Sequence, residues 1–202
     1  MLRTKIAVFV SGGGTNLQAL IDAEKRGEIP SGKIALVLSS NDKAYALTRA
    51  KKNDIPSVVV KRKEFPSQKE YEQRMKAILE ENGIEMVVLA GFMALLSEDF
   101  TGLYPKRIVN IHPSLIPAFC GKGFYGLYVH EAALEYGVKV TGATVHYVNE
   151  IPDGGEIILQ KAVAVLDGDT PEVLQKRVME EAEWVLLPKA VEMVARRLQK
   201  GN

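Results

Sequence analysis

The sequence contains very little cysteine, almost no excess charge and no long apolar segment. Cys120 is the single cysteine among 202 residues, which excludes an internal disulfide framework and favours a reducing compartment. Lysine and arginine number 26 against 25 aspartate and glutamate residues, and a net charge of +1 argues against a general nucleic-acid surface or a polybasic membrane patch. The first apolar run ends at Ser11, too early to span a membrane. We therefore expect a soluble cytoplasmic protein without nucleic-acid or membrane partners.

The residues that are present suit a folded α/β domain. Hydrophobic residues make up 47% of the chain, enough for a sizeable core. Expected strands of the first half are Lys5–Val10, Lys33–Leu38, Ser57–Val60, Glu85–Ala90 and Arg107–Ile111. Helical patterns separate them, beginning at Thr15 or Asn16 and covering Ala44–Lys52 and Ser67–Glu81. This alternation predicts a mostly parallel, Rossmann-like (doubly wound) sheet with helices on both faces, in a single domain spanning 1–202.

The second half has a different pattern. A long irregular segment rich in proline and glycine covers 113–126, and loops of this length in compact domains are usually functional. A helix is expected over Tyr128–Tyr136, then a strand over Ala143–Val148 and another over Glu156–Val165, antiparallel to its neighbour. Thr170 followed by Pro171 predicts the start of one long amphipathic helix running to about Arg197.

A glycine-rich loop, Ser11–Asn16, follows the first expected strand. Glycines at this place let backbone N–H groups approach an anion, and a helix N-terminus adds partial positive charge. No G-x-x-x-x-G-K-[ST] motif is present, which argues against a triphosphate site. Leu17 occupies the position of the third glycine of a dinucleotide motif, although Asp42 after the second strand leaves a nicotinamide cofactor as an alternative. A single phosphate, as on a ribonucleotide, fits the loop better than these, and an ordinary tight turn is the alternative.

Asn110 and His112 alternate at the end of an expected buried strand, so both side chains point to one face. Pro113 stiffens the backbone directly after them. The other two histidines fit structural roles equally well or better: His130 is expected on the surface of a helix, and His146 is as compatible with a structural role as with a catalytic one. His112 is therefore the favoured catalytic candidate.

Asp153 lies in a turn, Asp153-Gly154-Gly155, after a strand that could pair beside that of His112. A carboxylate at this position favours the imidazolium and raises the histidine pKa. Asn, His and Asp together then suit acyl transfer without an enzyme nucleophile. A Ser-His-Asp hydrolase using Ser114 is a rival, but no G-x-S-x-G motif is present. A zinc site from Cys120, His112 and His146 is also conceivable, without a recognised metal spacing.

These residues together resemble the folate-dependent formyltransferases, and in particular the branch that formylates glycinamide ribonucleotide. The resemblance covers nearly the whole chain. It rests on the loop 11–17, on Val88-Leu89-Ala90-Gly91-Phe92-Met93, on Asn110-Ile111-His112-Pro113-Ser114-Leu115, and on Gly142-Ala143-Thr144-Val145-His146 leading to Asp153-Gly154-Gly155. It implies a phosphate- and ribonucleotide-binding half, 1–105, and a catalytic and folate-binding half, 106–202. The donor it implies is 10-formyltetrahydrofolate, with 5′-phosphoribosylglycinamide as acceptor, no metal, and a monomer or homodimer.

The resemblance also implies roles for individual residues. Gly14, Thr15 and Asn16 would hold the substrate phosphate. Asn110 and protonated His112 would stabilise a tetrahedral oxyanion, while Asp153 would keep His112 protonated and help to move a proton through a water. The implied folate-binding residues are Met93, Ala94, Leu95, Leu96, Asn110 and Gln68, with backbone groups of 148–153 near the pterin.

Three positions depart from the family pattern. Gln68, next to Lys69, and Ala94 stand where the family has arginine, and Pro152 replaces an aliphatic residue. Glu183 resembles a family glutamate near the glycinamide, but this helix contains one extra residue. The alternatives are a formyltetrahydrofolate hydrolase or another formyltransferase of the superfamily, and a nucleotide-binding module without catalysis.

Overall fold

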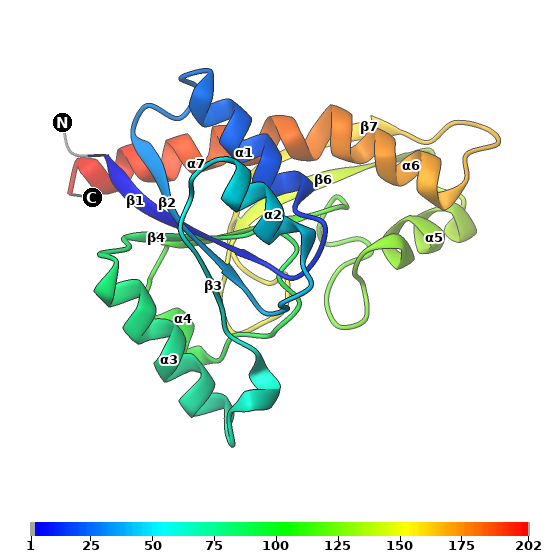
Figure 1. The fold of residues 1–202 in the computed structure, drawn as a ribbon. Helices are drawn as coiled ribbons and strands as arrows, with labels where there is room; N and C mark the ends of the chain where they lie inside the picture. The colour runs from blue at the N-terminus through cyan, green and yellow to red at the C-terminus, as the bar shows by residue number, and fades with distance from the viewer. Residues whose placement is uncertain (1–2, 202) are drawn as a thin grey trace.

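A seven-stranded β-sheet organises the chain in this computed structural model, which describes residues 3–201 (Figure 1). The strand order is β3-β2-β1-β4-β5-β6-β7. The strands are β1 (Thr4–Val10), β2 (Gly32–Ser39), β3 (Ser57–Val59), β4 (Met86–Leu89), β5 (Ile108–His112), β6 (Val140–Tyr147) and β7 (Ile157–Ala164). The first five strands pair in parallel, whereas β6 is antiparallel to both of its neighbours. The predicted mostly parallel sheet with an antiparallel strand in the C-terminal half is confirmed.

Helices cover both faces of this sheet (Figure 1). They are α1 (Thr15–Lys25), α2 (Tyr45–Lys52), a 3-10 turn η1 (Arg62–Glu64), α3 (Gln68–Glu81), α4 (Glu98–Gly102), α5 (Leu127–Tyr136), α6 (Pro171–Val178), a π-helical turn η2 (Met179–Glu183) and α7 (Trp184–Gln199). Helices α1, α2 and α7 pack on one face, and α3 and α4 on the other. The sequence did not predict η1 or α4, since both are too short to show a helical period.

Two separate apolar clusters explain why β1 is apolar throughout. Ile6, Val8 and Val10 point into the cluster beneath α1 and α7, while Ala7 and Phe9 point into the cluster beneath α3. A parallel strand covered on both faces needs apolar residues at every position rather than at alternate ones.

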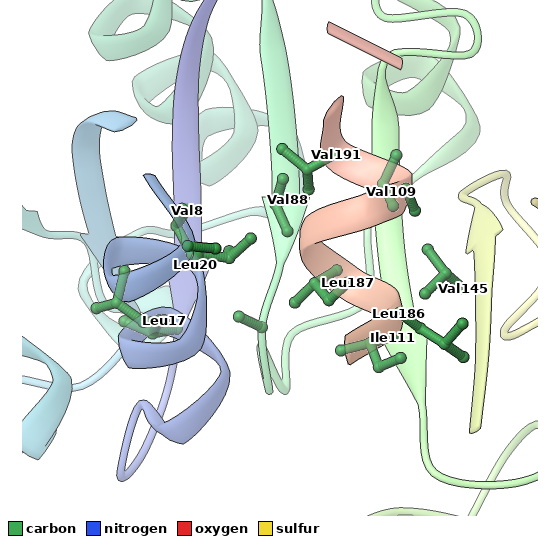
Figure 2. Close-up of a cluster of buried hydrophobic side chains, with 14 of the residues drawn as sticks. Val8, Leu17, Leu20, Val88, Val109, Ile111, Val145, Leu186, Leu187 and Val191 are labelled. Atoms are coloured by element: carbon green, nitrogen blue, oxygen red, sulfur yellow. The ribbon is translucent and has the colours of Figure 1, made fainter. Parts of the chain in front are cut away.

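The larger cluster fills the space between the sheet and helices α1 and α7. Figure 2 shows Leu20 of α1 beside Val8, and Leu187 of α7 between the strands β4 and β5. Leu20, Val8 and Leu187 are each fully buried. Because α7 crosses several strands here, the C-terminal helix holds the two halves of the sheet together.

The predicted long C-terminal helix needs one correction. Its start is as expected: the Thr170 side chain accepts a hydrogen bond from the Val173 N–H, and Pro171 is the first helical residue. However, the helix is interrupted by the π-helical turn η2. A π turn closes its hydrogen bonds over five residues instead of four, which is the geometry that one extra residue within a helix would produce.

The expected start of β6 at Ala143 was also wrong, because the strand begins three residues earlier at Val140. Glycine disfavours strands, and Gly142 therefore obscured this start. In the structure a side-chain carbon at Gly142 would lie 2.0 Å from the Lys161 carbonyl oxygen of β7. The glycine is thus needed for the close approach of the two strands.

The topology places several chain segments at one edge of the sheet. The chain leaves β1 toward β2 on one side and later returns on the other side of β1 as β4. Such a reversal creates a crevice at the carboxyl ends of the strands. The glycine loop after β1, the segment 91–97 after β4 and His112 at the end of β5 all lie at this edge. Among residues 3–201, no helix has the length and apolar character needed to cross a membrane.

Candidate functional site

The pairing of β5 with β6 brings the polar residues of the site together. Asn110 pairs with His146 in the antiparallel ladder. The Asn110 side-chain amide donates to His146 Nε2 over 3.1 Å and lies 3.4 Å from Asp153 Oδ1. His112 Nδ1 lies 3.4 Å from Asp153 Oδ2. The structure therefore places all three residues predicted to be catalytic in direct contact, and adds His146 to them.

A strained turn presents Asp153 to this cluster. Asp153 has φ +56, in the left-handed region that aspartate tolerates better than most residues. At Gly155, two residues later, a side-chain carbon would lie only 1.7 Å from the Tyr147 carbonyl oxygen. Gly154 is similarly crowded by Ile151. The two glycines are therefore required for the tight turn that aims the carboxylate at β5.

Backbone carbonyls determine which nitrogen of each histidine carries hydrogen. His112 Nε2 lies 2.8 Å from the Phe119 carbonyl oxygen, and His146 Nδ1 lies 2.8 Å from the Tyr147 carbonyl oxygen. A carbonyl oxygen only accepts, so both of these nitrogens must donate an N–H. In neutral His146, Nε2 is then an acceptor, which fixes the orientation of the Asn110 amide.

Burial and charge have opposing effects on His112 and Asp153. Burial lowers the pKa of His112, and the Asp153 carboxylate and the Phe119 carbonyl offset this only in part. Burial opposes ionisation of Asp153, but its contacts with His146, with His112 and with the Gly121 N–H hold its pKa below the usual value. Asp153 does raise the pKa of His112, as expected, but burial of the imidazole outweighs this effect, so the pKa lies below its usual value.

A cavity of about 330 Å³ opens beside this cluster. Asn110, His112 and Asp153 lie along one part of its lining, and the segment 91–96 along another. The predicted folate-binding residues Met93, Ala94, Leu95 and Leu96 thus share one cavity with the catalytic candidates. Met93 and Leu95 are 55% and 69% exposed although apolar, which indicates a surface prepared for a ligand.

The glycine loop is tied to the same edge. The Ser11 hydroxyl lies 2.6 Å from the Ser40 hydroxyl and accepts a hydrogen bond from the Met93 N–H over 2.9 Å. Gly14 has φ +71, and a side-chain carbon there would lie 2.7 Å from Ala46 Cβ. The space around Gly12 and Gly13 is open. The loop therefore has a fixed backbone and an accessible side at the N-terminus of α1.

Glu183 contacts the glycine loop rather than the cavity. Its carboxylate accepts a hydrogen bond from the Asn16 side-chain amide over 2.6 Å, and it is 6% exposed. Burial raises the pKa of Glu183, and the Asn16 contact offsets this in part. The π-helical turn, which ends at Glu183, is the local feature that points this carboxylate at Asn16.

Gln68 lies outside the lining of the cavity. Its side chain donates to the Leu95 carbonyl over 3.1 Å and to Glu72 over 2.7 Å. It also accepts a hydrogen bond from Arg62. Gln68 therefore supports the rim of the cavity at Leu95 from behind, and direct contact with a folate stays a prediction.

Three contributions to the site were missed in the sequence. His130, expected on the surface of a helix, lies on the covered side of α5 and is 1% exposed, and burial lowers its pKa to about 4. The Phe119 carbonyl and the Gly121 N–H are main-chain groups, which leave no signal in residue type. Only the length of the irregular segment 113–126 indicated that this region matters.

The alternative of a zinc site gains no support. In the part of the chain that the structure describes, no group of three or more His, Cys, Asp or Glu side chains is arranged to hold a metal ion. Cys120 instead directs its thiol to the Pro117 carbonyl over 3.3 Å.

The comparisons with known proteins identify a family. The Formyl transferase family profile matches residues 4–191. The chain is 42% identical over 184 residues to a phosphoribosylglycinamide formyltransferase of Haemophilus influenzae, covering 91% of this chain and 84% of that protein. It is 42% identical over 180 residues to a chloroplastic phosphoribosylglycinamide formyltransferase of Arabidopsis thaliana, covering 89% of this chain.

Coverage of the relatives is uneven. The chain spans 61% of the Arabidopsis protein and 18% or less of the animal relatives, which are named as trifunctional purine biosynthetic proteins. The crystal structure of glycinamide ribonucleotide transformylase 1 from Symbiobacterium toebii matches with a TM-score of 0.89 and 41% identity. That match covers 96% of this chain and 88% of the other.

Proposed function

The chain belongs to the formyl transferase family, and from this premise we propose that it transfers the formyl group of 10-formyltetrahydrofolate to the amine of 5′-phosphoribosylglycinamide in purine biosynthesis. The names of its relatives from Haemophilus influenzae and Symbiobacterium toebii support this acceptor. The observation that carries the proposal is the shared sheet edge. The glycine loop and the cavity beside His112 meet there, joined by the hydrogen bond between Ser11 and Met93.

The glycine loop suits the acceptor phosphate. Gly14, Thr15 and Asn16 begin helix α1, where free backbone N–H groups and the helix dipole favour an anion. The open space beside Gly12 and Gly13 allows an oxygen-rich group to approach the backbone. The buried carboxylate of Glu183, held by Asn16, would accept hydrogen bonds from neutral donors of the same substrate.

The cavity suits the donor. Flat heterocycles need apolar walls with a few backbone hydrogen-bonding groups, and the segments 91–96 and 148–153 supply both kinds of surface. The bound donor supplies the formyl carbon and a nitrogen that departs with a proton. Asn110 and His112 lie at one end of the same cavity, so the reacting carbon would be placed beside them.

The chemistry then needs three actions from the protein. As the amine attacks the formyl carbon, Asn110 and protonated His112 donate hydrogen bonds to the developing oxyanion. Asp153, ionised because its pKa is lowered, favours the imidazolium of His112. Through a water, Asp153 would also accept a proton from the attacking amine and return it to the departing nitrogen. This route requires neither a metal nor a covalent intermediate with the enzyme.

One contact must change during this reaction. Both N–H groups of the Asn110 amide face protein acceptors, His146 at 3.1 Å and Asp153 at 3.4 Å. The longer contact is the weaker hydrogen bond. We infer that the formyl oxygen replaces Asp153 as the partner of this N–H, which also frees the carboxylate for the proton transfer.

The test is formyl transfer measured with glycinamide ribonucleotide against water as acceptor. We expect formate release to water to be negligible beside transfer to the ribonucleotide. Asp153→Asn and His112→Ala should each lower kcat by about 10²–10⁴. The matched control is Met193→Ala, an exposed position on α7 far from the cavity, which should keep full activity.

Three results would contradict the proposal. Formate release that is equally fast without an amine would identify a formyltetrahydrofolate hydrolase. Full activity in Asp153→Asn and His112→Ala would remove the assigned mechanism. Absence of any turnover, combined with tight ribonucleotide binding, would indicate a nucleotide-binding module.

A further inference from the structure

The irregular segment 113–126 makes two main-chain contacts with His112 and Asp153, the catalytic pair. The proposed function does not use these two contacts. The Phe119 carbonyl accepts a hydrogen bond from His112 Nε2 over 2.8 Å. Two residues later, the Gly121 N–H donates to Asp153 Oδ2 over 2.8 Å. One short piece of backbone thus holds both residues: the Phe119 carbonyl lies at the ring nitrogen of His112 that faces away from Asp153, and the Gly121 N–H binds the same Asp153 oxygen that faces His112 Nδ1.

The backbone at Phe119 is in a costly conformation. Its φ is +49, in the left-handed region, where a residue with a side chain is disfavoured relative to glycine. Such conformations persist only when the surroundings hold them, and they concentrate at functional sites. The surroundings here are aromatic: the Phe119 ring centroid lies 6.4 Å from that of Phe124 and 6.0 Å from that of Tyr136.

The Phe119 carbonyl has a specific chemical effect on His112. In a neutral imidazole only one nitrogen carries hydrogen. Without a partner for Nε2, hydrogen on Nδ1 would be favoured, because Nδ1 could then donate to the Asp153 carboxylate 3.4 Å away. With the carbonyl present, hydrogen stays on Nε2 and Nδ1 presents a lone pair to Asp153. The next proton that His112 binds must therefore enter at Nδ1.

We propose that Phe119 is a positioning residue for the catalytic histidine: its carbonyl, held by the packing of its ring, keeps one hydrogen on His112 Nε2, so that the second proton, which makes the ring an oxyanion donor, resides on Nδ1 beside Asp153. The Gly121 N–H complements this by stabilising the ionised carboxylate that faces the Nδ1 proton. The role in turnover rests on the proposed formyl transfer, but the position of the hydrogen does not.

Other titratable groups around His112 set the background for this effect. Asp153 faces its Nδ1, His146 of β6 contacts the same carboxylate at 3.5 Å, and His130 of α5 lies within electrostatic range. Cys120, next to Phe119, is affected by Asp153 as well. None of these groups accepts the hydrogen of His112 Nε2, so the Phe119 carbonyl has no substitute among the described residues 3–201.

The direct test is long-range proton–nitrogen NMR of the full-length protein labelled in its three histidines, without substrates. His112 is assigned by comparison with the His112→Ala spectrum. Above the pH at which His112 loses its charge, we expect Nε2 to show the shift of a protonated nitrogen and Nδ1 that of an unprotonated one. The same spectrum showing hydrogen on Nδ1 would overturn the proposal.

The variant test is Phe119→Gly, which relieves the left-handed backbone but removes the aromatic packing. We expect the hydrogen of neutral His112 to move wholly or partly to Nδ1, and kcat to fall about tenfold or more with KM values unchanged within about twofold. The Phe119 contact raises the affinity of His112 for protons. Its loss should therefore shift the fall of activity with rising pH to lower pH.

Two comparison variants make this result specific. Phe119→Tyr keeps the ring and should restore wild-type spectra and kcat. Tyr128→Ala removes an exposed aromatic residue of α5 whose ring contacts Tyr125 and not Phe119, and it should change neither the spectrum nor kcat.

Phe119→Gly with a wild-type spectrum and wild-type kcat would overturn the positioning role. If Phe119→Gly fails to fold, the wild-type spectrum decides alone. A wild-type protein without formyl transfer, but with hydrogen on Nε2, would refute the proposed function and leave the hydrogen assignment supported.

Discussion

Acid should destabilise this protein through His130, a histidine whose burial the sequence did not reveal. Both ring nitrogens of His130 lack hydrogen-bond partners in the described structure, and the residue is 1% exposed on α5. Burial lowers its pKa from 6.5 to about 4. The unfolded chain then binds a proton at a pH where the folded chain does not, so lowering the pH favours unfolding.

The size of the effect follows from this shift in pKa. The full shift corresponds to about 3 kcal/mol, because each unit contributes about 1.4 kcal/mol. The loss begins as the pH falls through the unfolded value and is complete below the folded one. Between about pH 7 and about pH 5, His130 alone should lower the free energy of unfolding by about 2 kcal/mol.

The assay is urea unfolding at several pH values in that interval, at constant ionic strength, for the wild type and for His130→Leu and His130→Gln. Both variants should lose about 2 kcal/mol of the pH dependence, whatever their stability at about pH 7. Some dependence should remain, since burial also lowers the pKa of His112. Equal pH dependence in the wild type and both variants would refute the burial argument.

Three further predictions concern the turn that carries Asp153, the apolar core, and the hydrogen bond between Asn16 of the glycine loop and Glu183. Gly155→Ala should lower kcat at least about tenfold, because the added side-chain carbon would collide with the Tyr147 carbonyl and displace Asp153. Gly102→Ala, whose added carbon would have no atom within 4 Å, should keep full activity in the same assay. Leu187→Ala should lower the free energy of unfolding in urea by about 2–5 kcal/mol, against less than about 0.5 kcal/mol for the exposed Met193→Ala on the same helix. Asn16→Ala should lower the free energy of unfolding by about 1–3 kcal/mol at about pH 7, because it leaves the Glu183 carboxylate buried without its hydrogen-bond partner. Adding Glu183→Gln should recover part of this loss, as measured by thermal or urea unfolding.

The sheet and most of its helices were predictable because their signals are local. A strand buried on both faces must be apolar throughout, as at residues 6–10, and a capping threonine followed by proline marks a helix start, as at Thr170. The catalytic candidates were also accessible, because alternation along a strand puts Asn110 and His112 on one face. Their contact with Asp153 depended on β6 pairing with β5, which the sequence suggested and the structure confirms.

The remaining features depend on tertiary contacts. His130 is followed by Glu131, and α5 as a whole has no clear apolar stripe, so nothing in its sequence indicates which side is covered. Packing of α5 against α6 decides this, and that contact joins residues far apart in the chain. The Phe119 carbonyl and the Gly121 N–H are present in any residue, so only the folded loop can show that they hold the catalytic pair.

The π-helical turn η2 also affects how this chain is compared with others. Buried residues recur at intervals of four through Leu174, Val178, Ala182 and Leu186, on both sides of the turn. A residue inserted relative to the family would therefore be absorbed inside Met179–Glu183, while the flanking helices keep their buried faces. An alignment that forbids gaps within helices would move the mismatch to a loop and assign the role of Glu183 to a neighbour. Residue roles can therefore be transferred from an alignment in this region only if the alignment places the gap inside the helix.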